Sequence, residues 1–488
     1  MKRRSPRERL PQSPRTDMNS KITLGFVAVM LLGGCAVGPN YKRPALDVPG
    51  NYRFAPAVAT NSLAELPWWE VFHDPTLQGL IRTALTNNYD LKIAVARVEQ
   101  ARNLATVAAA PLFPQINYGG DVGRGRNSLL NTPTSNNGAT TGSALLNLNA
   151  FWEIDLWGRI RRLSEAGRAQ YLASEEARRG VTITLVSDVA TAYFQLLDFD
   201  RELQIQIAAT NAYAGSYRIF NERLQNGVAS KLETDRAAAA LANAAAQIPD
   251  LEIQIAATEN QLSVLLGHNP GPIARGSLES QPGFAPEIPA GLPSALLQRR
   301  PDVAAAEDQL IAANANIGAN FANFFPQIGL TTFLGRVSPT LSAFTGGSAN
   351  AWNVGATMTG PIFQGGQLRA QYKASKAAFD EAKAAYEKSV LTAFQDVSNA
   401  LISREKLAER VVYDEQAVSA LESSVELATE RYLNGRASYF EVLQAQQELY
   451  PTQRALTQTQ VGEFIAVVNL YRALGGGWQV PDEMSKKK

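Results

Sequence analysis

Few residues in this chain could carry out chemistry. Its 488 residues include two histidines and one cysteine, which leaves little for metal or redox chemistry. His73 in "FHDP" and His268 in "LGHNP" are far apart in sequence, so we expect turn residues rather than a catalytic pair. The sequence contains no nucleophile elbow, no phosphate-binding loop and no cluster with metal-ligand spacing. An enzyme is therefore not favoured, and we predict no metal and no bound cofactor.

The single cysteine follows a short apolar segment. Residues 18–35 read "MNSKITLGFVAVMLLGGC", in which a lysine precedes an apolar run of about 11 residues and small residues follow. The run is too short to cross a bilayer as a helix. "LLGGC" resembles a bacterial lipobox, in which Cys35 becomes the first mature residue and carries a diacylglycerol and an N-acyl chain. A free cysteine after an ordinary signal is the alternative.

The residues around the cysteine predict where the chain is anchored. Several acyl chains on one residue give stable membrane anchoring. Ala36, where an aspartate could stand, resembles the pattern of lipoproteins sorted to the outer membrane. We therefore interpret residues 1–34 as an N-terminal extension and a lipoprotein signal peptide, with translation starting at Met1 or Met18.

The chain also repeats itself. "ERLQNGVASKLET" at 222–234 and "ERYLNGRASYFEV" at 430–442 are identical at seven of thirteen positions, and "PLFPQI" recurs as "NFFPQI". These duplications predict tandem units at 74–270 and 293–475. Repeats of this kind usually stack and share one core. The remaining segments are an N-terminal part, a Pro/Gly-rich linker and a tail, at 35–73, 271–292 and 476–488.

Each unit has the same predicted helices around its strands. A helix of moderate length precedes the strands, and a very long helix, the duplicated turn and a returning helix follow them. In the first unit the long helix covers about 163–225, and some 60 residues make a rod of about 90 Å. Its apolar residues follow coiled-coil spacing, at Leu185, Val189, Ala192, Leu196, Phe199 and Leu203.

The duplicated turn reads as the tip of a helical hairpin. Gly227 and Gly435 suit a left-handed helix C-cap, and Ser230 and Ser438 suit the N-cap of the returning helix. A tight corner between helices would explain these residues. It leaves open why Glu233 and Glu441 stand six residues past each glycine.

Four strands are predicted, at about 113–127, 143–157, 326–337 and 350–363. "ALLNLNAFWEIDLW" alternates cleanly, with Trp152 and Ile154 on an apolar face and Glu153 and Asp155 on a largely polar one. Each strand is long enough to cross a membrane at a tilt, and a soluble sandwich is the alternative. Four strands cannot close a barrel with an open lumen, whereas three copies would pool about twelve.

The quoted motifs together resemble a known family. "GCAVGPNYKRP", "WWEVFHDPTLQGLI", "DLWGR", "RRPDVAAAE", "VVNLYRALGGGWQ" and both "FPQI" turns match, in order, the lipoprotein branch of the outer membrane factors of tripartite efflux pumps. The resemblance implies a mainly α chain with membrane β-strands that forms a homotrimer. Its outer-membrane β-barrel, with four strands per chain, would continue into a long periplasmic α-helical barrel with an equatorial belt.

The resemblance also implies a periplasmic gate. The family pattern is Tyr-x-x-Gly followed by acidic residues six and nine positions past the glycine, and Tyr432 and Glu441 match it. Gln444 stands where the family often has the second acid, so the match is incomplete there. Glu233 matches the acid after the first tip. Tyr439 adds bulk to the second tip. A solvated, charged helix end is the alternative. Gly227, Ser230, Gly435 and Ser438 would dock the adaptor, and Glu153 and Asp155 would face the barrel lumen.

These expectations add up to a passive exit duct for drugs or other small toxic compounds. The partners would be a periplasmic adaptor, an inner-membrane resistance-nodulation-division transporter and outer-membrane lipid. A net charge of +1 gives no reason to expect nucleic acid. The alternatives are the outlet of a type I protein secretion system and a structural coiled-coil lipoprotein without a pore. Only five methionines weakly disfavour a duct dedicated to copper.

Overall fold

The computed structural model describes residues 36–55, 62–126, 140–281, 289–339, 341–346 and 349–478. Cys35 and the predicted signal lie outside the described residues. The chain divides into two compact units. The first unit comprises Met1–Tyr41, Thr106–Ala166 and Asn314–Ala377, and the second comprises Lys42–Ala105, Gly167–Ala313 and Ala378–Lys488.

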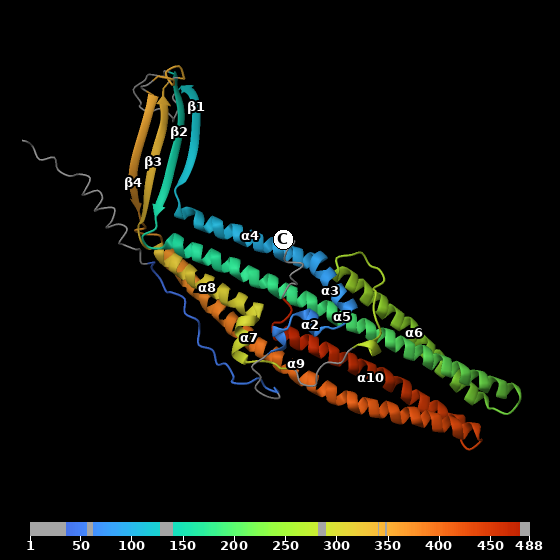
Figure 1. Ribbon diagram of the computed structural model, residues 1–488. Coiled ribbons are helices and arrows are strands. Elements are labelled where there is room, and N and C mark those ends of the chain that lie inside the picture. Colours follow the sequence, from blue (N-terminus) through green and yellow to red (C-terminus); the bar gives the residue numbers. More distant parts are fainter. Residues whose placement is uncertain are drawn as a thin grey trace, which may run out of the picture. The chain divides into compact units, whose positions relative to one another are not determined.

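The order of helices and strands confirms the two tandem repeats (Figure 1). The first repeat contains α3 (Pro75–Asn87), α4 (Tyr89–Ala109), η2 (Ala110–Leu112), β1 (Gln115–Arg126), β2 (Thr140–Ile154), α5 (Arg159–Gln225) and α6 (Lys231–Leu265). The second contains α7 (Pro293–Arg299), α8 (Pro301–Ala322), β3 (Gln327–Ser338), β4 (Asn350–Thr359), α9 (Gln367–Leu433) and α10 (Tyr439–Ala473). Three short helices, η1 (Leu63–Glu65), α2 (Trp68–Val71) and η3 (Leu278–Ser280), lie outside the repeats. Helices α5 and α9 have 67 residues each, and α6 and α10 have 35 each.

The first unit contains one antiparallel sheet. Its strands lie in the order β1-β2-β3-β4, so β1 and β4 are the outer strands (Figure 1). Strands β2 and β4 end at Ile154 and Thr359, earlier than the sequence predicted. The Asp155 carboxylate accepts the Arg161 backbone N–H at 2.8 Å and so starts α5, while Pro361 cannot donate to a strand ladder.

The "DLWGR" motif builds the junction between strand and helix. The Trp157 ring stacks on Phe325 with ring centroids 4.7 Å apart, and its Nε1 donates to the Pro326 carbonyl at 2.8 Å. The Val37 backbone N–H donates to the Trp157 carbonyl at 3.0 Å. Gly158 has φ of +78°, and a Cβ there would come within 2.6 Å of the Ala36 Cβ. Only glycine fits this contact, which fixes the start of the described chain at the end of β2.

The core of the second unit surrounds α5. Its largest fully buried side chains include Trp68, Tyr193, Leu196 and Tyr471. One stretch of α5 is long and apolar enough to cross a membrane, but two thirds of it is buried among the chain's own helices, as in a core helix. Thr76 and Tyr193 both donate to Asp74, which caps α3. Burial raises the pKa of Asp74, but the hydrogen bonds outweigh it and hold the pKa below its ordinary value.

The predicted coiled-coil seam of α5 is correct only in part. Leu185, Val189, Ala192 and Leu196 are buried, but Phe199 and Leu203 are only half-buried. Glu202 is buried in place of Leu203, with 2% of the residue exposed. The exchange is possible because Arg454 of α10 donates to Glu202 Oε2 at 2.6 and 2.8 Å, and Gln458 donates to Oε1 at 2.7 Å.

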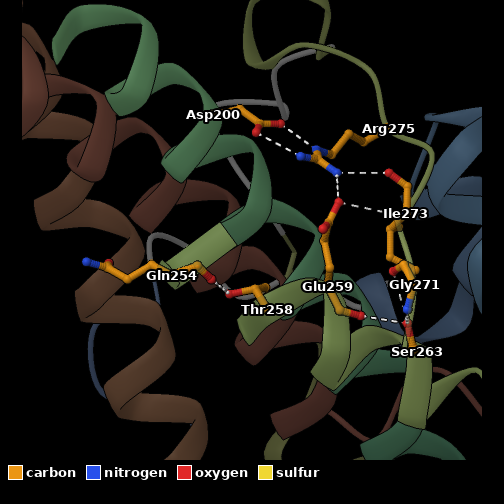
Figure 2. Close-up of polar contacts among 8 residues, drawn as sticks. All are labelled: Asp200, Gln254, Thr258, Glu259, Ser263, Gly271, Ile273 and Arg275. Carbon is orange, nitrogen blue, oxygen red and sulfur yellow. Dashed lines mark hydrogen bonds and ion pairs between the residues drawn. The ribbon is translucent and has the colours of Figure 1, made fainter. Parts of the chain in front are cut away.

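One arginine fastens the start of the linker between the repeats (Figure 2). Arg275 donates to both Asp200 oxygens of α5, at 2.5 and 2.9 Å, and to Glu259 of α6 at 2.5 Å. Ser263 Oγ accepts the Gly271 N–H at 3.2 Å. The hydrogen bond to Asp200 raises the pKa of Arg275, so its charge is permanent. The linker is thereby tied to both arms of the first helical hairpin.

The second arginine of the "RRPD" motif likewise connects helices in the second repeat. Arg300 is buried and makes a two-pronged ion pair with Asp302, at 2.9 and 2.6 Å. It also donates to Asp396 of α9 at 2.9 Å and to the Ala473 carbonyl at the end of α10 at 3.2 Å. Arg300 therefore satisfies an otherwise open helix end and joins α8, α9 and α10.

Candidate functional site: the two-faced sheet and the hairpin tips

The two faces of the sheet differ in polarity. The strand register places Tyr118 opposite Leu148, Leu148 opposite Leu334, and Leu334 opposite Trp352. These side chains are on one face, and Tyr118 and Trp352 are 85% and 76% exposed. The same face also carries Ile116, Val122, Leu146, Ala150, Trp152, Leu330, Val354 and Met358. An exposed apolar surface that spans four strands marks a site of contact with a membrane or another protein.

The opposite face is polar and carries small side chains. Its residues include Asn117, Asp121, Asn147, Asn149, Thr331, Asn353 and Thr357. The large apolar exceptions among those described are Leu145, Phe151, Phe333 and Val337. The predicted phase of β2 is therefore correct. Asp121 was not among the predicted lumen residues, although the two-residue period from Asn117 places it on this face.

Glu153 and Asp155 are held in ion pairs. The Glu153 carboxylate accepts from Arg159 at 2.6 and 3.1 Å, and only 13% of its side chain is exposed. Asp155 pairs with Arg161 at 3.4 Å and lies just beyond the strand. A basic residue at position 153 would place two cations together, so charge reversal there would disturb the junction between β2 and α5. Their predicted role in a lumen remains a prediction.

The first hairpin tip is a capping box. Gly227 has φ of +75°, as a left-handed C-cap requires. Ser230 Oγ accepts the Glu233 N–H at 3.3 Å, and Glu233 Oε2 accepts the Ser230 N–H at 2.9 Å. Glu233 therefore has a local structural task, which the S-x-x-E pattern signals in sequence. This answers the question that a simple corner left open for the first tip.

The second tip has the same backbone but different side-chain contacts. Gly435 has φ of +70°, yet Ser438 makes no side-chain capping bond to α10. Glu441 pairs instead with Arg431 at 3.5 Å, and both side chains are about half exposed. Gln444 donates to Glu448 at 3.2 Å. Because exposed ion pairs contribute less than about 1 kcal/mol, Glu441 is only loosely held.

Two tyrosines of the second hairpin contact α5 of the first. Tyr439 is 9% exposed, its hydroxyl is hydrogen-bonded to Ser216, and its ring meets Phe220 edge-on at 4.6 Å. The Tyr432 hydroxyl accepts from Arg223 Nη1 at 2.6 Å, and its ring packs on Tyr439 at 5.1 Å. The predicted pair of tyrosines thus comes together. Sequence spacing gave no signal for Ser216 and Arg223, which lie more than 200 residues away.

A buried acid lies further along the same pair of helices. Asp198 stands one turn before Glu202 on α5, and its Oδ1 is buried without a hydrogen-bond partner among the described residues. The pKa of Asp198 is raised to about 7, chiefly by burial and also by the neighbouring Glu202 carboxylate, while Arg454 opposes both effects. The three groups form one electrostatic cluster between α5 and α10.

Comparison with known proteins identifies the family. The model of the outer membrane efflux protein family matches residues 80–268 and 292–476. The chain belongs to the outer membrane efflux protein family. It is 37% identical over 459 residues to the probable efflux pump outer membrane protein TtgC of Pseudomonas putida, covering 93% of this chain and 94% of TtgC. It is 33% identical to the cation efflux system protein CusC of Escherichia coli, covering 93% of this chain and 98% of CusC.

A solved structure supports the same assignment. The outer-membrane channel OprN superposes with a TM-score of 0.84 at 30% sequence identity, covering 91% of this chain and all of OprN. This outer membrane efflux protein is accordingly an outer-membrane component of efflux systems, and the relatives named above are efflux proteins rather than enzymes. Among the described residues, no three acidic, histidine or cysteine side chains form a group that could hold a metal ion.

Asp198 gives a prediction with a defined pH dependence. Because its pKa is higher in the folded chain than the unfolded value of about 3.9, its stabilising contribution is complete below pH 4 and is lost as the pH rises through 7. Asp198→Asn should therefore stabilise the purified protein by about 1–3 kcal/mol at pH 8 and change little at pH 4. Thermal unfolding in detergent at both pH values measures this.

Glu202→Gln is the matched control one turn away. It should lower the unfolding midpoint at pH 8, since Arg454 loses its carboxylate partner. An equal shift for Asp198→Asn at pH 4 and pH 8 would contradict the assignment of the buried charge.

Proposed function

We propose that three copies of this chain form the passive outer-membrane duct of a tripartite efflux pump. The observation that carries the proposal is the sheet, with a continuous apolar face, a polar face and two open edges. Within a bilayer every backbone N–H and C=O needs a partner, so an open sheet edge is not tolerated. Three sheets joined edge to edge would leave none open, with apolar side chains toward lipid and polar side chains toward a lumen.

The partners and direction of transport follow from this duct. A passive pore supplies no energy, so the drive would come from an inner-membrane transporter of the resistance-nodulation-division class, through a periplasmic adaptor. The names of TtgC and CusC as efflux proteins favour a pump over a protein-secretion outlet. The two-faced sheet favours a pore over a structural lipoprotein. Cargo would be drugs or other small toxic compounds chosen by the transporter.

The periplasmic gate is assigned to the second hairpin tip. Tyr432 is held by Arg223, and Glu441 by Arg431, both through exposed contacts that a docking partner can exchange. A hydrogen bond to a charged group contributes about 1.5–3 kcal/mol, which suits a tip that rests closed and opens on binding. Gly227, Ser230, Gly435 and Ser438 would form the turns that meet the adaptor. Gln444 and Tyr439 would support the gate, and Glu233 would brace the first tip through its capping box.

Lipid anchoring is assigned to Cys35. Its neighbour Ala36 lies against Gly158, four residues past the end of β2, which supports an anchor on this side of the sheet.

Metabolic labelling with palmitate tests the anchor. Cys35→Ser should abolish labelling because the sulfur and the new N-terminus are both lost as acceptors, whereas Ala36→Ser should keep it. Undiminished labelling of Cys35→Ser would refute the lipobox assignment.

Channel recordings test the duct and its gate together. In planar bilayers the wild type should form pores with low resting conductance. Tyr432→Phe and Arg223→Ala should each raise the resting conductance several-fold. The double variant should add little, because both substitutions remove the same hydrogen bond between Arg223 and Tyr432. Adding Glu441→Ala to Tyr432→Phe should raise it further and sensitise cells to large antibiotics such as vancomycin.

Glu233→Gln serves as the control, since it alters only the first capping box. It should leave resting conductance near the wild-type value. If no pore forms, the proposed duct is refuted. If a pore forms but its conductance does not change on substitution of Tyr432, Arg223 and Glu441, only the proposed gate is refuted.

A further inference from the structure

Two constant shifts in residue number relate the strands of the first repeat to those of the second. β1 begins at Gln115 and β3 at Gln327, a shift of 212 residues. The elements after the second strand of each hairpin show another shift, since α5 begins at Arg159 and α9 at Gln367, 208 residues apart. The two shifts relate the first repeat to the second across the sheet.

These shifts reproduce a register that was not used to derive them. In the first hairpin Gln115 pairs with Phe151. Moving Gln115 by 212 and Phe151 by 208 gives Gln327 and Thr359, which pair in the second hairpin. The repeat is therefore accurate to a single residue in its strands.

The joint between the repeats is the pairing of β2 with β3. There Leu148 pairs with Leu334. Moving Leu334 back by 212 gives Val122 on β1, and moving Leu148 forward by 208 gives Ala356 on β4. These two residues lie on the opposite outer strands of the sheet, so within one chain they cannot meet.

We propose that β4 of one copy pairs with β1 of the next in the register that the internal joint defines, with Ala356 opposite Val122. The inference rests on the three-copy barrel proposed above and specifies its seam. The same shifts place Gly355 opposite Gly123, Thr357 opposite Asp121, Met358 opposite Gly120, Thr359 opposite Gly119 and Gly360 opposite Tyr118.

This register keeps both faces of the sheet continuous. Val122 and Ala356 both belong to the apolar face, and Asp121 and Thr357 both belong to the polar face. A slip of one residue would turn the whole apolar row of one copy against the polar row of the next.

The register also matches large side chains with glycines. Tyr118 falls opposite Gly360, and Met358 falls opposite Gly120. The internal joint also places a large ring against a glycine, but on the diagonal: Phe151 pairs with Thr331, and a Cβ on Gly329 would come within 2.7 Å of the Phe151 ring. A slip of two residues would place Tyr118 opposite Met358, two large side chains on the same face.

The joint is head-to-tail, because β4 of each copy meets β1 of another. Contacts of this kind form rings when the rotation closes, and a ring has no open edge. The pairing of β2 with β3 inside one chain is thus the model for the pairing of β4 with β1 between copies.

Disulfide cross-linking of the full chain in membranes tests the register. Asp121→Cys with Thr357→Cys should give covalent dimers and trimers on non-reducing gels after mild oxidation. Within one chain these positions are three strand spacings apart, roughly 14 Å, so they cannot bond to each other. Asp121→Cys with Gly355→Cys or with Thr359→Cys provides off-register controls, which should cross-link at least tenfold less, since such diagonal positions are about 7–8 Å apart.

The outcomes separate the register from the trimer. Stronger cross-linking of an off-register pair would overturn the register but leave the proposed barrel standing. A trimeric mass in detergent with no cross-link from any pair would overturn the inferred seam alone. A monomeric mass and no cross-link would overturn both. Each single-cysteine variant, which keeps Cys35, sets the background.

Discussion

The rest of the molecule depends on the requirement that strands in a bilayer leave no backbone group unpaired. The described residues of each chain form four strands, and the pairing among them satisfies β2 and β3 on both sides but β1 and β4 on one side only. The apolar face adds a second requirement, since large side chains such as Tyr118 and Trp352 stand exposed on it. Lipid can cover that face, but only other strands can cover the edges. The single chain is thus an incomplete structure by its own hydrogen bonding.

The helices are joined by three buried or partly buried arginines that make ion pairs between them. Arg275 ties the linker to α5 and α6, and Arg300 ties α8 to α9 and α10. Arg454 joins α10 to Glu202 of α5. Each guanidinium bridges elements that lie far apart in sequence, and removal of any one would leave carboxylates without a counter-charge. At the second hairpin tip the Tyr432–Arg223 and Glu441–Arg431 contacts are exposed, which is the property expected of contacts that a docking partner can exchange.

Local patterns predicted much of this fold. Asn-Gly at each tip, the Ser230 cap at the first tip, the two-residue period of β2 and the duplicated segments each encode structure within a few neighbouring residues, and the structure agrees with them. The predicted end of β2 was wrong because Asp155 acts as a helix cap, which no alternation pattern reveals, and that of β4 was wrong because Pro361 cannot donate to a strand ladder. The seam of α5 was wrong beyond Leu196 because Glu202 is buried, and that depends on Arg454 in another repeat. The partners of Tyr432 and Tyr439 were missed for the same reason, since they come from packing between hairpins.

In the proposed barrel, one face of the sheet lies against lipid and the other lines a water-filled lumen. Single cysteines placed along β4 from 351 to 358, with a membrane-impermeant maleimide applied to outer-membrane vesicles, measure this most directly. We expect cysteines at Asn353, Gly355 and Thr357 to react, and those at Trp352, Val354 and Ala356 to be protected. Equal reaction at all positions, or the opposite alternation, would contradict it.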